Sequence, residues 1–297
     1  MEMIKITFLG TGNAIPTRKR NHTAILLNYK AENILLDCGE GTQRQFRLAG
    51  LSPSKLDKIF LTHWHGDHVL GLPGLFQTLS NSDYKKTIEI YGPKGTSAYI
   101  KELKNLFNLK IKTEEKEVET KVLETKEFKI ESAPMSHGTP TLAYSFIIKD
   151  KLRLDKQKIK KLNLPNSPLL GKLQEGKDIT IKGKRIKSSQ VTYLEKGRKV
   201  AFILDTSQNA NTVKIAKNSD LLICESSFSK EESALAKKYK HLTAEQAAMI
   251  AKKSNSKKLI LTHISQRYEH NPDIILSEAK SVFRNVSIAK DFDVVEV

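Results

Sequence analysis

The chain carries, at residues 62–68, the sequence Thr-His-Trp-His-Gly-Asp-His, which places three imidazoles and one carboxylate within seven positions. These nitrogen and oxygen donors are ligands that Zn²⁺ and similar divalent cations prefer in proteins. His63 and His65 can project to one side of an extended segment, and the glycine that follows permits a turn that brings Asp67 and His68 from another direction. Four donors in two orientations fit two metal ions better than one. The alternative is a chance cluster on a surface loop.

Other polar residues repeat this placement directly after a short apolar run, a pattern that indicates a β-strand and its end. They are Asp37 after Ile34–Leu36, Asp205 after Val200–Leu204, Glu225 after Leu221–Cys224 and His263 after Leu259–Thr262. Since rigid elements fix ligand geometry, strand ends that deliver histidine and carboxylate to one rim form a natural scaffold for a metal site. We expect these side chains to meet in a shared crevice.

The remaining pattern predicts an α/β fold. Further strands are expected at Ile4–Leu9, Ala24–Leu27, Ile59–Leu61, Ile88–Tyr91, Phe128–Ile130 and Val286–Ala289. A helix is expected at Thr243–Lys253, because Thr243 and Gln246 have the spacing of a capping box. The alternating charges of residues 112–131 indicate a solvated surface. No repeat period is visible in the sequence, which argues against a solenoid or a propeller.

The positive charge of the chain is concentrated in one segment. The 297 residues carry a formal net charge of +17, and residues 149–199 alone contain sixteen basic and five acidic residues, a net of +11. This segment lacks a long apolar run and contains the turn-forming sequence Leu-Pro-Asn-Ser-Pro at 164–168, which suggests a protruding insertion. Such a local excess indicates a nucleic-acid footprint. The alternative is a solvated surface rich in lysine, since 41 of the 50 basic residues are Lys.

Two cysteines, Cys38 and Cys224, cannot form a disulfide framework, so a reducing cytoplasm is the expected compartment. Residues 1–12 contain too short an apolar run for a signal peptide, and no run approaches the ~20 residues of a membrane span. We therefore expect a cytoplasmic protein with no membrane partner.

The motif at residues 63–68 resembles the His-x-His-x-Asp-His signature of the metallo-β-lactamase superfamily. The resemblance narrows to the ribonuclease Z family, in its short form. It is carried by Phe8–Gly12, Leu35–Gln45 with its Glu-Gly-Thr-Gln-Arg-Gln run, Thr62–Leu75, His241–Thr243, Glu245–Ala247, Leu261–Ser265 and Arg267–Tyr268. It implies an αβ/βα metallo-β-lactamase sandwich, formed as a single domain over residues 1–297, with an inserted basic flexible arm at residues 149–196.

The resemblance also implies two zinc ions per subunit. His63, His65 and His137 would hold one ion, and Asp67, His68 and His263 would hold the other, with Asp205 between them; Asp67 would also take part in catalysis. Without the resemblance, His137 would be a loop histidine and Asp205 a strand-end carboxylate or helix cap. Asp37 is expected to orient a ligand imidazole, although a turn-forming Asp before Gly39 is an alternative.

Hydrolysis of RNA requires a proton for the leaving 3′ oxygen. In the family this acid is the histidine of a His-x-Thr motif, here His241, supported by a glutamate that matches Glu225. A carboxylate beside the imidazole favours the charged, proton-donating form. The family usually has His before that glutamate, where this chain has Cys224. If that histidine only supports the site, Cys224 is tolerated; if it is needed, activity should be low or the metal preference altered.

Substrate binding is expected from cations near the metal rim and on the arm. The loop at residues 16–21 resembles the family's Pro-x-Lys-x-Arg-Asn loop, which lies by the acceptor end of tRNA. The expected substrate contacts are Arg18, Lys19, Arg20 and Asn21 in the loop, Arg44 and Arg267 as phosphate clamps, and Lys156, Lys160, Lys161 and Lys172 in the arm. A solvated basic loop is the alternative for the first four. His22 and His270 are expected to be bystanders.

Together these features predict an endoribonuclease that removes the 3′ trailer of precursor tRNA by zinc-activated hydroxide attack and leaves a 3′-hydroxyl on the tRNA. The resemblance further implies a homodimer. The alternatives are a general phosphodiesterase or another hydrolase of this fold, which would have no use for the basic arm, and a non-enzymatic RNA-binding protein.

Overall fold

The structure, a computed structural model, describes residues 3–181 and 183–297. Lys182, one of the basic residues of the predicted arm, lies outside the described residues. The chain divides into two compact units. Unit 1 contains the described residues within 1–124, 130–146 and 199–297, and unit 2 contains those within 125–129 and 147–198.

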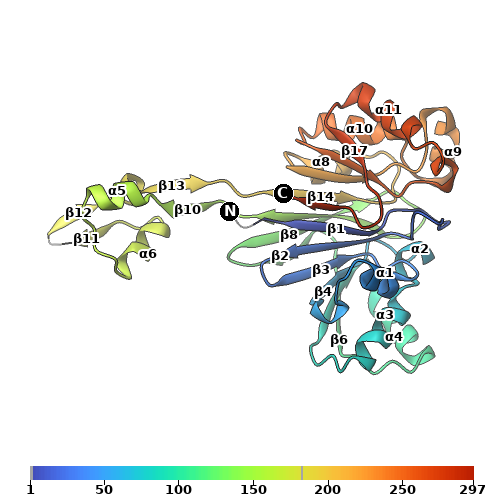
Figure 1. Cartoon of the computed structure of the whole chain (residues 1–297), viewed down its shortest axis with the longest axis horizontal. Coiled ribbons are helices and arrows are strands. Elements are labelled where there is room, and N and C mark those ends of the chain that lie inside the picture. Colours follow the sequence, from blue (N-terminus) through green and yellow to red (C-terminus); the bar gives the residue numbers. More distant parts are fainter. Residues whose placement is uncertain (1–2, 182) are drawn as a thin grey trace. The chain divides into compact units, whose positions relative to one another are not determined.

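Unit 1 is built on two sheets, each with seven strands among the described residues (Figure 1). Sheet 1 has the order β18 (Val294–Glu296), β1 (Lys5–Gly10), β2 (Ala24–Tyr29), β3 (Glu32–Leu36), β4 (Lys58–Phe60), β5 (Ile88–Gly92) and β6 (Thr113–Glu117). Sheet 2 has the order β17 (Val286–Ile288), β16 (Leu259–Thr262), β15 (Leu221–Glu225), β14 (Lys199–Ile203), β9 (Thr141–Ile148), β8 (Phe128–Met135) and β7 (Lys121–Glu124). Strands β3 to β6 are parallel to one another, and so are β14 to β17.

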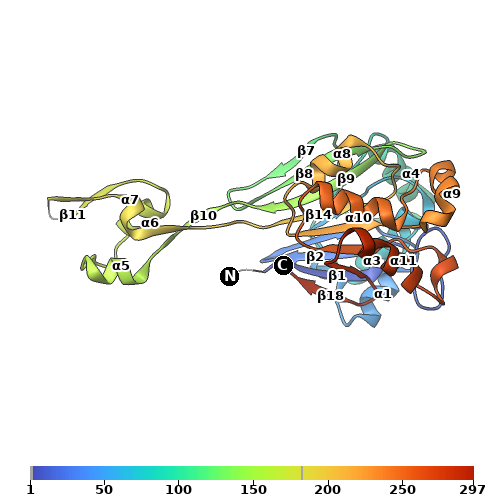
Figure 2. The same ribbon diagram turned by 90° about the horizontal axis from the view of Figure 1, so that it is seen from above.

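Helices cover the outer face of each sheet (Figures 1 and 2). On sheet 1 these are α1 (Thr42–Leu48), α3 (Leu72–Asn81) and α4 (Thr96–Leu106), which bury Phe46, Phe76 and Ile100 against the strands. On sheet 2 they are α8 (Ala210–Ala216), α10 (Ala244–Lys253) and α11 (Asp273–Val282). The shorter elements are α2 (Gly66–Val69), α9 (Ser233–Tyr239), η1 (Pro53–Lys55), η2 (Lys230–Glu232) and η3 (Gln266–Tyr268).

The inner faces of the two sheets pack against each other through aromatic side chains. Phe60 of β4 meets Tyr144 of β9 edge to face with ring centroids 5.3 Å apart, and Tyr29 of β2 meets Phe146 of β9 at 5.5 Å. The Tyr144 hydroxyl also donates to the carbonyl of Leu61 at 2.7 Å. Edge-to-face pairs add to the burial of apolar area, so this layer fixes the sheets to one another.

The predicted helix near residue 243 is confirmed. Thr243 caps α10: its Oγ1 accepts from the backbone N–H of Gln246 at 3.2 Å, and Gln246 Oε1 accepts from the Thr243 N–H at 3.0 Å. The charged stretch 112–131, expected as solvated surface apart from the strand at Phe128–Ile130, also supplies β6 and β7, which are edge strands of the two sheets and have no fully buried residue. Edge strands tolerate charged side chains because one side of the strand is unpaired. Within the described residues, no helix combines the length and apolarity needed to cross a membrane.

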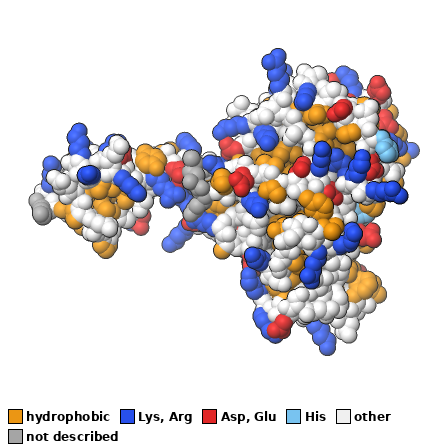
Figure 3. Space-filling model, viewed as in Figure 1, with side chains coloured by type: hydrophobic (Ala, Val, Ile, Leu, Met, Phe, Trp, Pro, Cys, Tyr) orange, Lys and Arg blue, Asp and Glu red, His pale blue; other side chains and the backbone are white. Residues whose placement is uncertain are grey.

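Unit 2 has a small hydrophobic core that the sequence did not reveal. Its strands are β10 (Lys151–Leu154) paired with β13 (Thr192–Glu195) and β11 (Ile179–Ile181) paired with β12 (Lys184–Ile186), and its helices are α5 (Lys156–Lys161), α6 (Leu169–Gln174) and α7 (Ser188–Val191). Leu173 and Val191 are fully buried in this core. Figure 3 shows Lys and Arg side chains on the visible surface of this unit, which therefore combines a small core with basic surface residues.

Candidate active site

Most of the predicted polar residues lie at or just beyond the ends of strands. Asp37 follows β3, residues 63–68 follow β4 and lead into α2, Asp205 follows β14, Glu225 ends β15 and His263 follows β16. Because β3 and β4 are parallel, as are β14 to β16, their carboxyl ends meet at one edge of each sheet. His137 lies between β8 and β9, and His241 lies between α9 and α10.

The first cluster joins His63, His65, His137 and Asp205, whose ligand atoms lie within 4.8 Å of one another. His137 Nε2 is 3.2 Å from His65 Nδ1, and Asp205 Oδ2 is 3.6 Å from His63 Nε2 and 3.7 Å from His137 Nε2. Three imidazole nitrogens therefore face one carboxylate oxygen.

The second cluster joins Asp67, His68, His263 and the same Asp205. Asp205 Oδ1 is 3.1 Å from His263 Nε2 and 3.3 Å from His68 Nε2. Asp67 Oδ2 lies 3.3 Å from His263 Nε2 and 3.4 Å from His68 Nε2. The two oxygens of Asp205 thus face different clusters.

The donor set fits a metal. Asp205 is 2% exposed and His63 is fully buried, yet His63 Nε2 has no hydrogen-bond partner among the described residues, and Asp205 Oδ1 makes no hydrogen bond despite its closeness to two imidazole nitrogens. Buried polar atoms without partners are costly unless an ion satisfies them. Imidazole and carboxylate groups that converge in this way match the ligand chemistry of zinc and similar cations.

Electrostatics inside the site favour charged carboxylates. Burial opposes ionisation of Asp205, but the neighbouring His263 and His68 outweigh it and hold the pKa of this carboxyl well below its usual value. Burial likewise opposes ionisation of Asp67, and His68 together with His263 lowers its pKa nevertheless. Burial lowers the pKa of His63, so this imidazole is neutral and able to bind a cation.

Asp37 and Thr62 orient the histidines that follow β4. Asp37 is fully buried; its Oδ2 accepts from His68 Nδ1 at 2.6 Å and from the Thr62 hydroxyl at 2.8 Å, and its Oδ1 accepts from the Thr62 N–H at 2.7 Å. The Thr62 oxygen lies 3.0 Å from His63 Nδ1. Asp37 adopts φ +55°, a left-handed conformation that costs of order 1–3 kcal/mol in a residue other than glycine. In this conformation the carboxylate bonds the His68 ring directly and the His63 ring only through the Thr62 hydroxyl.

On sheet 2, Glu225 is fully buried and is the hub of a second network. Its Oε1 accepts from the Thr206 N–H at 2.7 Å, and both oxygens lie 3.1 Å from His241 Nδ1. Burial lowers the pKa of His241, but the Glu225 and Asp205 carboxylates raise it to about 9. A cation bound at Asp205 would oppose this rise. Ser227, which the sequence did not single out, donates to Glu225 Oε2 at 2.8 Å.

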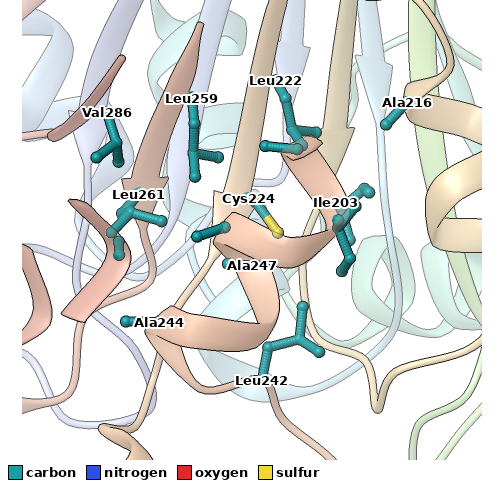
Figure 4. Packing of buried hydrophobic residues seen from close by; sticks show 14 of the residues in the cluster. Ile203, Ala216, Leu222, Cys224, Leu242, Ala244, Ala247, Leu259, Leu261 and Val286 are labelled. Carbon is teal, nitrogen blue, oxygen red and sulfur yellow. The ribbon is translucent and has the colours of Figure 1, made fainter. Parts of the chain in front are cut away.

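Cys224 faces away from this site. Adjacent residues of a strand point to opposite faces, so Glu225 on the site side puts Cys224 on the helix side. Figure 4 shows its sulfur among buried apolar side chains, including Ile203 and Ala247. Burial raises the pKa of this thiol, which is therefore an uncharged packing group. A histidine at this position would also point into the core and not at the metals.

Lys240 makes two hydrogen bonds to His137 and thereby holds the loop between β8 and β9. The Lys240 carbonyl accepts from His137 Nδ1 at 3.0 Å, and the Lys240 ammonium donates to the His137 carbonyl at 3.1 Å. The residue caps α9 in a left-handed conformation with φ +57°. A metal-ligating histidine commonly donates its other ring N–H to a carbonyl in this way. Sequence alone gave no sign of this contact.

The loop at residues 16–21 separates into exposed and buried cations. Arg18 and Lys19 are exposed, whereas Arg20 is 7% exposed and donates to Thr11 Oγ1 at 2.7 Å and to the Ala289 carbonyl at 2.6 Å. Its guanidinium is therefore used inside the protein, contrary to the expectation that it contacts substrate. Asn21 donates through Nδ2 to the Glu40 carbonyl at 2.7 Å, which anchors the loop.

The other cations expected to contact substrate are exposed. They are Arg44 and Arg267 in unit 1 and Lys156, Lys160, Lys161 and Lys172 in unit 2. Arg267 lies over the Phe228 ring at 5.6 Å, and that ring is 6.1 Å from the His241 ring. His22 is buried, His270 is exposed, and neither belongs to a metal cluster found among the described residues.

Comparisons with known proteins identify the family of this chain. The family model described as Anti-Pycsar protein Apyc1 matches residues 4–163, just over half of the chain. That match includes residues 62–68 and ends before Asp205. A ribonuclease Z from Nanoarchaeum equitans is 40% identical over 296 residues, which cover 98% of this chain and 92% of the relative.

Solved structures extend the likeness to the fold. A crystal structure of the short form of human tRNase Z, ELAC1, is 28% identical, has a TM-score of 0.71 and matches over 98% of both chains. The metallo-β-lactamase fold protein YhfI from Bacillus subtilis, 21% identical, superposes over both complete chains with a TM-score of 0.74. The predicted αβ/βα sandwich is thereby confirmed. By residues 4–163 the chain belongs to the family described as Anti-Pycsar protein Apyc1, and over nearly its whole length it belongs to the ribonuclease Z family.

Proposed function

We propose that this protein is an endoribonuclease that removes the 3′ trailer of precursor tRNA with two zinc ions per subunit. The observation that carries the proposal is the pair of ligand clusters that share Asp205, beside a buried Glu225–His241 pair. Full-length similarity to ribonuclease Z supports tRNA as the substrate.

The ligand assignment follows the two clusters. His63, His65 and His137 would hold one ion, and Asp67, His68 and His263 the other, with one oxygen of Asp205 directed to each cluster. Bound zinc would supply a hydroxide nucleophile near pH 7 and neutralise charge on the phosphodiester. Asp67 serves catalysis by completing the second cluster, and Asp37 by orienting His68.

His241 is the general acid in this proposal. Its Nδ1 is hydrogen-bonded to Glu225, so Nε2 is the nitrogen that can donate a proton to the leaving 3′ oxygen. The product is a tRNA with a 3′-hydroxyl and a trailer with a 5′ phosphate. Arg18, Lys19, Arg44 and Arg267 are exposed cations suited to contacts with phosphates near the cut.

Unit 2 would grip the tRNA through its exposed lysines, among them Lys156, Lys160, Lys161 and Lys172. The charge excess of residues 149–199 supports this role, because phosphate neutralisation by Lys and Arg dominates nucleic-acid affinity. The same proposal includes a homodimer and a cytoplasmic location. Both cysteines are free and buried, which is compatible with a reducing compartment.

The direct test is incubation of the purified protein with a 3′-extended tRNA, with and without a chelator, followed by mapping of the cut to the nucleotide. We expect one cut at the trailer junction that disappears on chelation and returns with zinc. Cleavage that survives chelation, or an intact precursor under all conditions, would refute the proposal.

The role of unit 2 is tested by deleting residues 151–196. This deletion joins Asp150 directly to Gly197, two residues that are already close because the Gly197 N–H donates to Asp150 Oδ1 at 2.8 Å. We expect the deletion to abolish precursor cleavage and to spare hydrolysis of a small chromogenic phosphodiester. Equal loss on both substrates would contradict a tRNA-gripping role, and equal retention would favour a general phosphodiesterase.

A second test reverses the charge of two lysines in unit 2 without deleting any residue. Lys160→Glu with Lys161→Glu changes two exposed lysines in the last turn of α5, and Lys252→Glu with Lys253→Glu makes the same change at the end of α10. Only the α5 pair should weaken tRNA binding. If unit 2 neutralises about six phosphates, the wild-type log–log salt slope should be near −5, and the α5 variant should be shallower. An equal effect of both pairs would mean that only net charge matters.

A further inference from the structure

Ser227 lies between a proposed metal ligand and the carboxylate that supports the proposed acid. It is fully buried, two residues beyond the end of β15. Its Oγ is 2.8 Å from Glu225 Oε2, 2.9 Å from His263 Nδ1 and 3.1 Å from the His263 carbonyl. This one hydroxyl therefore contacts both the proposed metal ligand His263 and the carboxylate of Glu225.

The direction of these hydrogen bonds follows from the tautomer of His263. Its Nε2 faces the carboxylates of Asp67 at 3.3 Å and Asp205 at 3.1 Å, which is the side of the metal cluster. An imidazole that binds a cation through Nε2 carries its proton on Nδ1, so Nδ1 donates to Ser227 Oγ. The single hydroxyl proton then goes to Glu225 Oε2, since a bond to a charged oxygen is shorter and stronger than one to a carbonyl.

We propose that Ser227 is a positioning residue that fixes the ring of His263 for metal binding and joins it to the Glu225–His241 pair. The chain of hydrogen bonds begins at His263 Nδ1, passes through the Ser227 hydroxyl and ends at the Glu225 carboxylate, which also accepts from His241. This inference rests on the proposed function, because it assumes that His263 is a metal ligand.

Loss of the hydroxyl would leave two buried groups without partners, the Nδ1–H of His263 and one oxygen of Glu225. Each carries a desolvation cost once its partner is gone. The His263 ring would be free to rotate, which weakens metal binding. Glu225 would keep the Thr206 N–H and His241 as partners, so the acid would be perturbed less than the metal ligand.

The test compares two adjacent serines that are both buried. Ser226 Oγ has no hydrogen-bond partner among the described residues, so Ser226→Ala removes the same atom from a neighbouring position without breaking a bond. We expect Ser227→Ala to weaken zinc affinity by about tenfold or more, measured by competition with a chromophoric chelator. Ser226→Ala should match the wild type. Ser227→Thr, which keeps the hydroxyl, should restore most of the affinity.

A spectroscopic readout separates positioning from packing. In the cobalt-loaded protein, Ser227→Ala should shift the visible absorption bands of the metal, whereas Ser226→Ala should leave them in place. If Ser227→Ala fails to fold, Ser227→Cys keeps a polar group at the position but weakens the hydrogen bonds, and it should lose affinity in the same way. Equal zinc affinity and equal spectra for the Ser227 and Ser226 variants would overturn the inference.

The same measurements distinguish this inference from the function on which it rests. A wild-type protein that binds zinc with the predicted dependence on Ser227 and leaves precursor tRNA intact would refute the proposed function alone. A wild-type protein that binds no zinc would refute both. Normal tRNA cleavage together with unchanged zinc affinity in Ser227→Ala and Ser227→Cys would refute only the role of Ser227.

Discussion

On sheet 1, a buried carboxylate is bonded to one imidazole directly and to another through a hydroxyl. Asp37 accepts from His68 Nδ1 and from the Thr62 hydroxyl, whose oxygen lies 3.0 Å from His63 Nδ1. Both rings present Nε2 to the oxygens of Asp205. All parts of this half therefore point towards the metal clusters.

On sheet 2, a buried carboxylate, a hydroxyl and two imidazoles are again bonded to one another, but the two imidazoles have different proposed roles. Glu225 accepts from His241 directly and is joined to His263 through Ser227. His263 belongs to the cluster around Asp205, whereas His241 belongs to neither of the clusters that contain Asp205. In the proposed function, the group around Asp37 on sheet 1 supports metal binding alone. The similar group around Glu225 on sheet 2 supports both a metal ligand and the general acid.

The largest effect is expected where the two halves join, at Asp205. Asparagine keeps the size of the side chain but replaces one charged oxygen with an amide nitrogen, so one cluster must lose its shared ligand. Asp205→Asn should lose metal and reduce precursor cleavage by more than about 100-fold, beyond the loss typical of groups that only support ligands. Metal content and cleavage are measured on the same sample. Full activity with both metals retained would show that Asp205 does not link the halves.

The second largest effect should separate chemistry from metal binding. His241→Ala removes the proposed acid and no member of the two Asp205 clusters, so turnover should fall about 10²–10⁴-fold at unchanged zinc content. His270→Ala, which removes an exposed histidine, is the matched control and should be silent. Unchanged turnover in His241→Ala would assign proton transfer elsewhere.

Amide substitutions of the two carboxylates should give opposite patterns. In Asp37→Asn, an amide N–H can face the Nδ1–H of His68, so zinc affinity should drop about 10- to 100-fold and added zinc should restore activity. In Glu225→Gln, the main loss should be in kcat, and added zinc should not restore it. If added zinc restored the activity of Asp37→Asn and Glu225→Gln equally, the two carboxylates would not have different roles.

A smaller effect is expected from the two threonines that precede ligand histidines. Thr62 is bonded to Asp37, whereas Thr262 Oγ1, equally buried, has no partner among residues 3–181 and 183–297. Valine keeps the shape of threonine without the hydroxyl. Thr62→Val should weaken zinc affinity about tenfold, and Thr262→Val should leave it unchanged. Chelator competition on both variants measures the difference, and equal losses would mean that the Thr62 bond contributes nothing specific.

The smallest effect is expected at Cys224. Its thiol lies in the core beneath α10, so Cys224→Ala should change kcat/KM less than about twofold and lower stability by about 1 kcal/mol. Thermal denaturation and precursor cleavage are the two measurements. A loss of turnover comparable to that of His241→Ala would show that this position acts on the site.

A metal site could be predicted from the sequence because the motif at residues 63–68, Asp205 and His263 come after short apolar runs, and parallel strands collect such ends at one edge. His137 entered the predicted ligand set only through the family resemblance, since by itself it is a loop histidine. The sequence left the effect of Cys224 open; in the structure it alternates with Glu225 on β15 and faces the core. Ser227 could not be predicted, because its role depends on a histidine 36 residues away in sequence reaching its hydroxyl. A buried serine next to it, Ser226, makes no such contact.

Two further features escaped prediction for physical reasons. Arg20 was expected to contact substrate because it belongs to a run of three cations in the loop at residues 16–21, but Thr11 and the Ala289 carbonyl accept hydrogen bonds from its guanidinium inside the protein. The core of unit 2 was missed because its apolar residues, such as Leu173 and Val191, lie in helices and strands of only three to six residues. Periodicity needs longer windows than these elements provide.

The separate core of unit 2 has a consequence for how the protein unfolds. Its buried cluster shares no residue with the clusters beneath the helices of unit 1. A small core contributes little free energy, so unit 2 can open as a sub-global event while the sandwich stays folded. Amide protons of β10 and β13 would then exchange before those of β14 and β15, and a protease would cut the native chain first within residues 149–196. Recognition of tRNA could thus be lost by proteolysis while the metal centre remains intact.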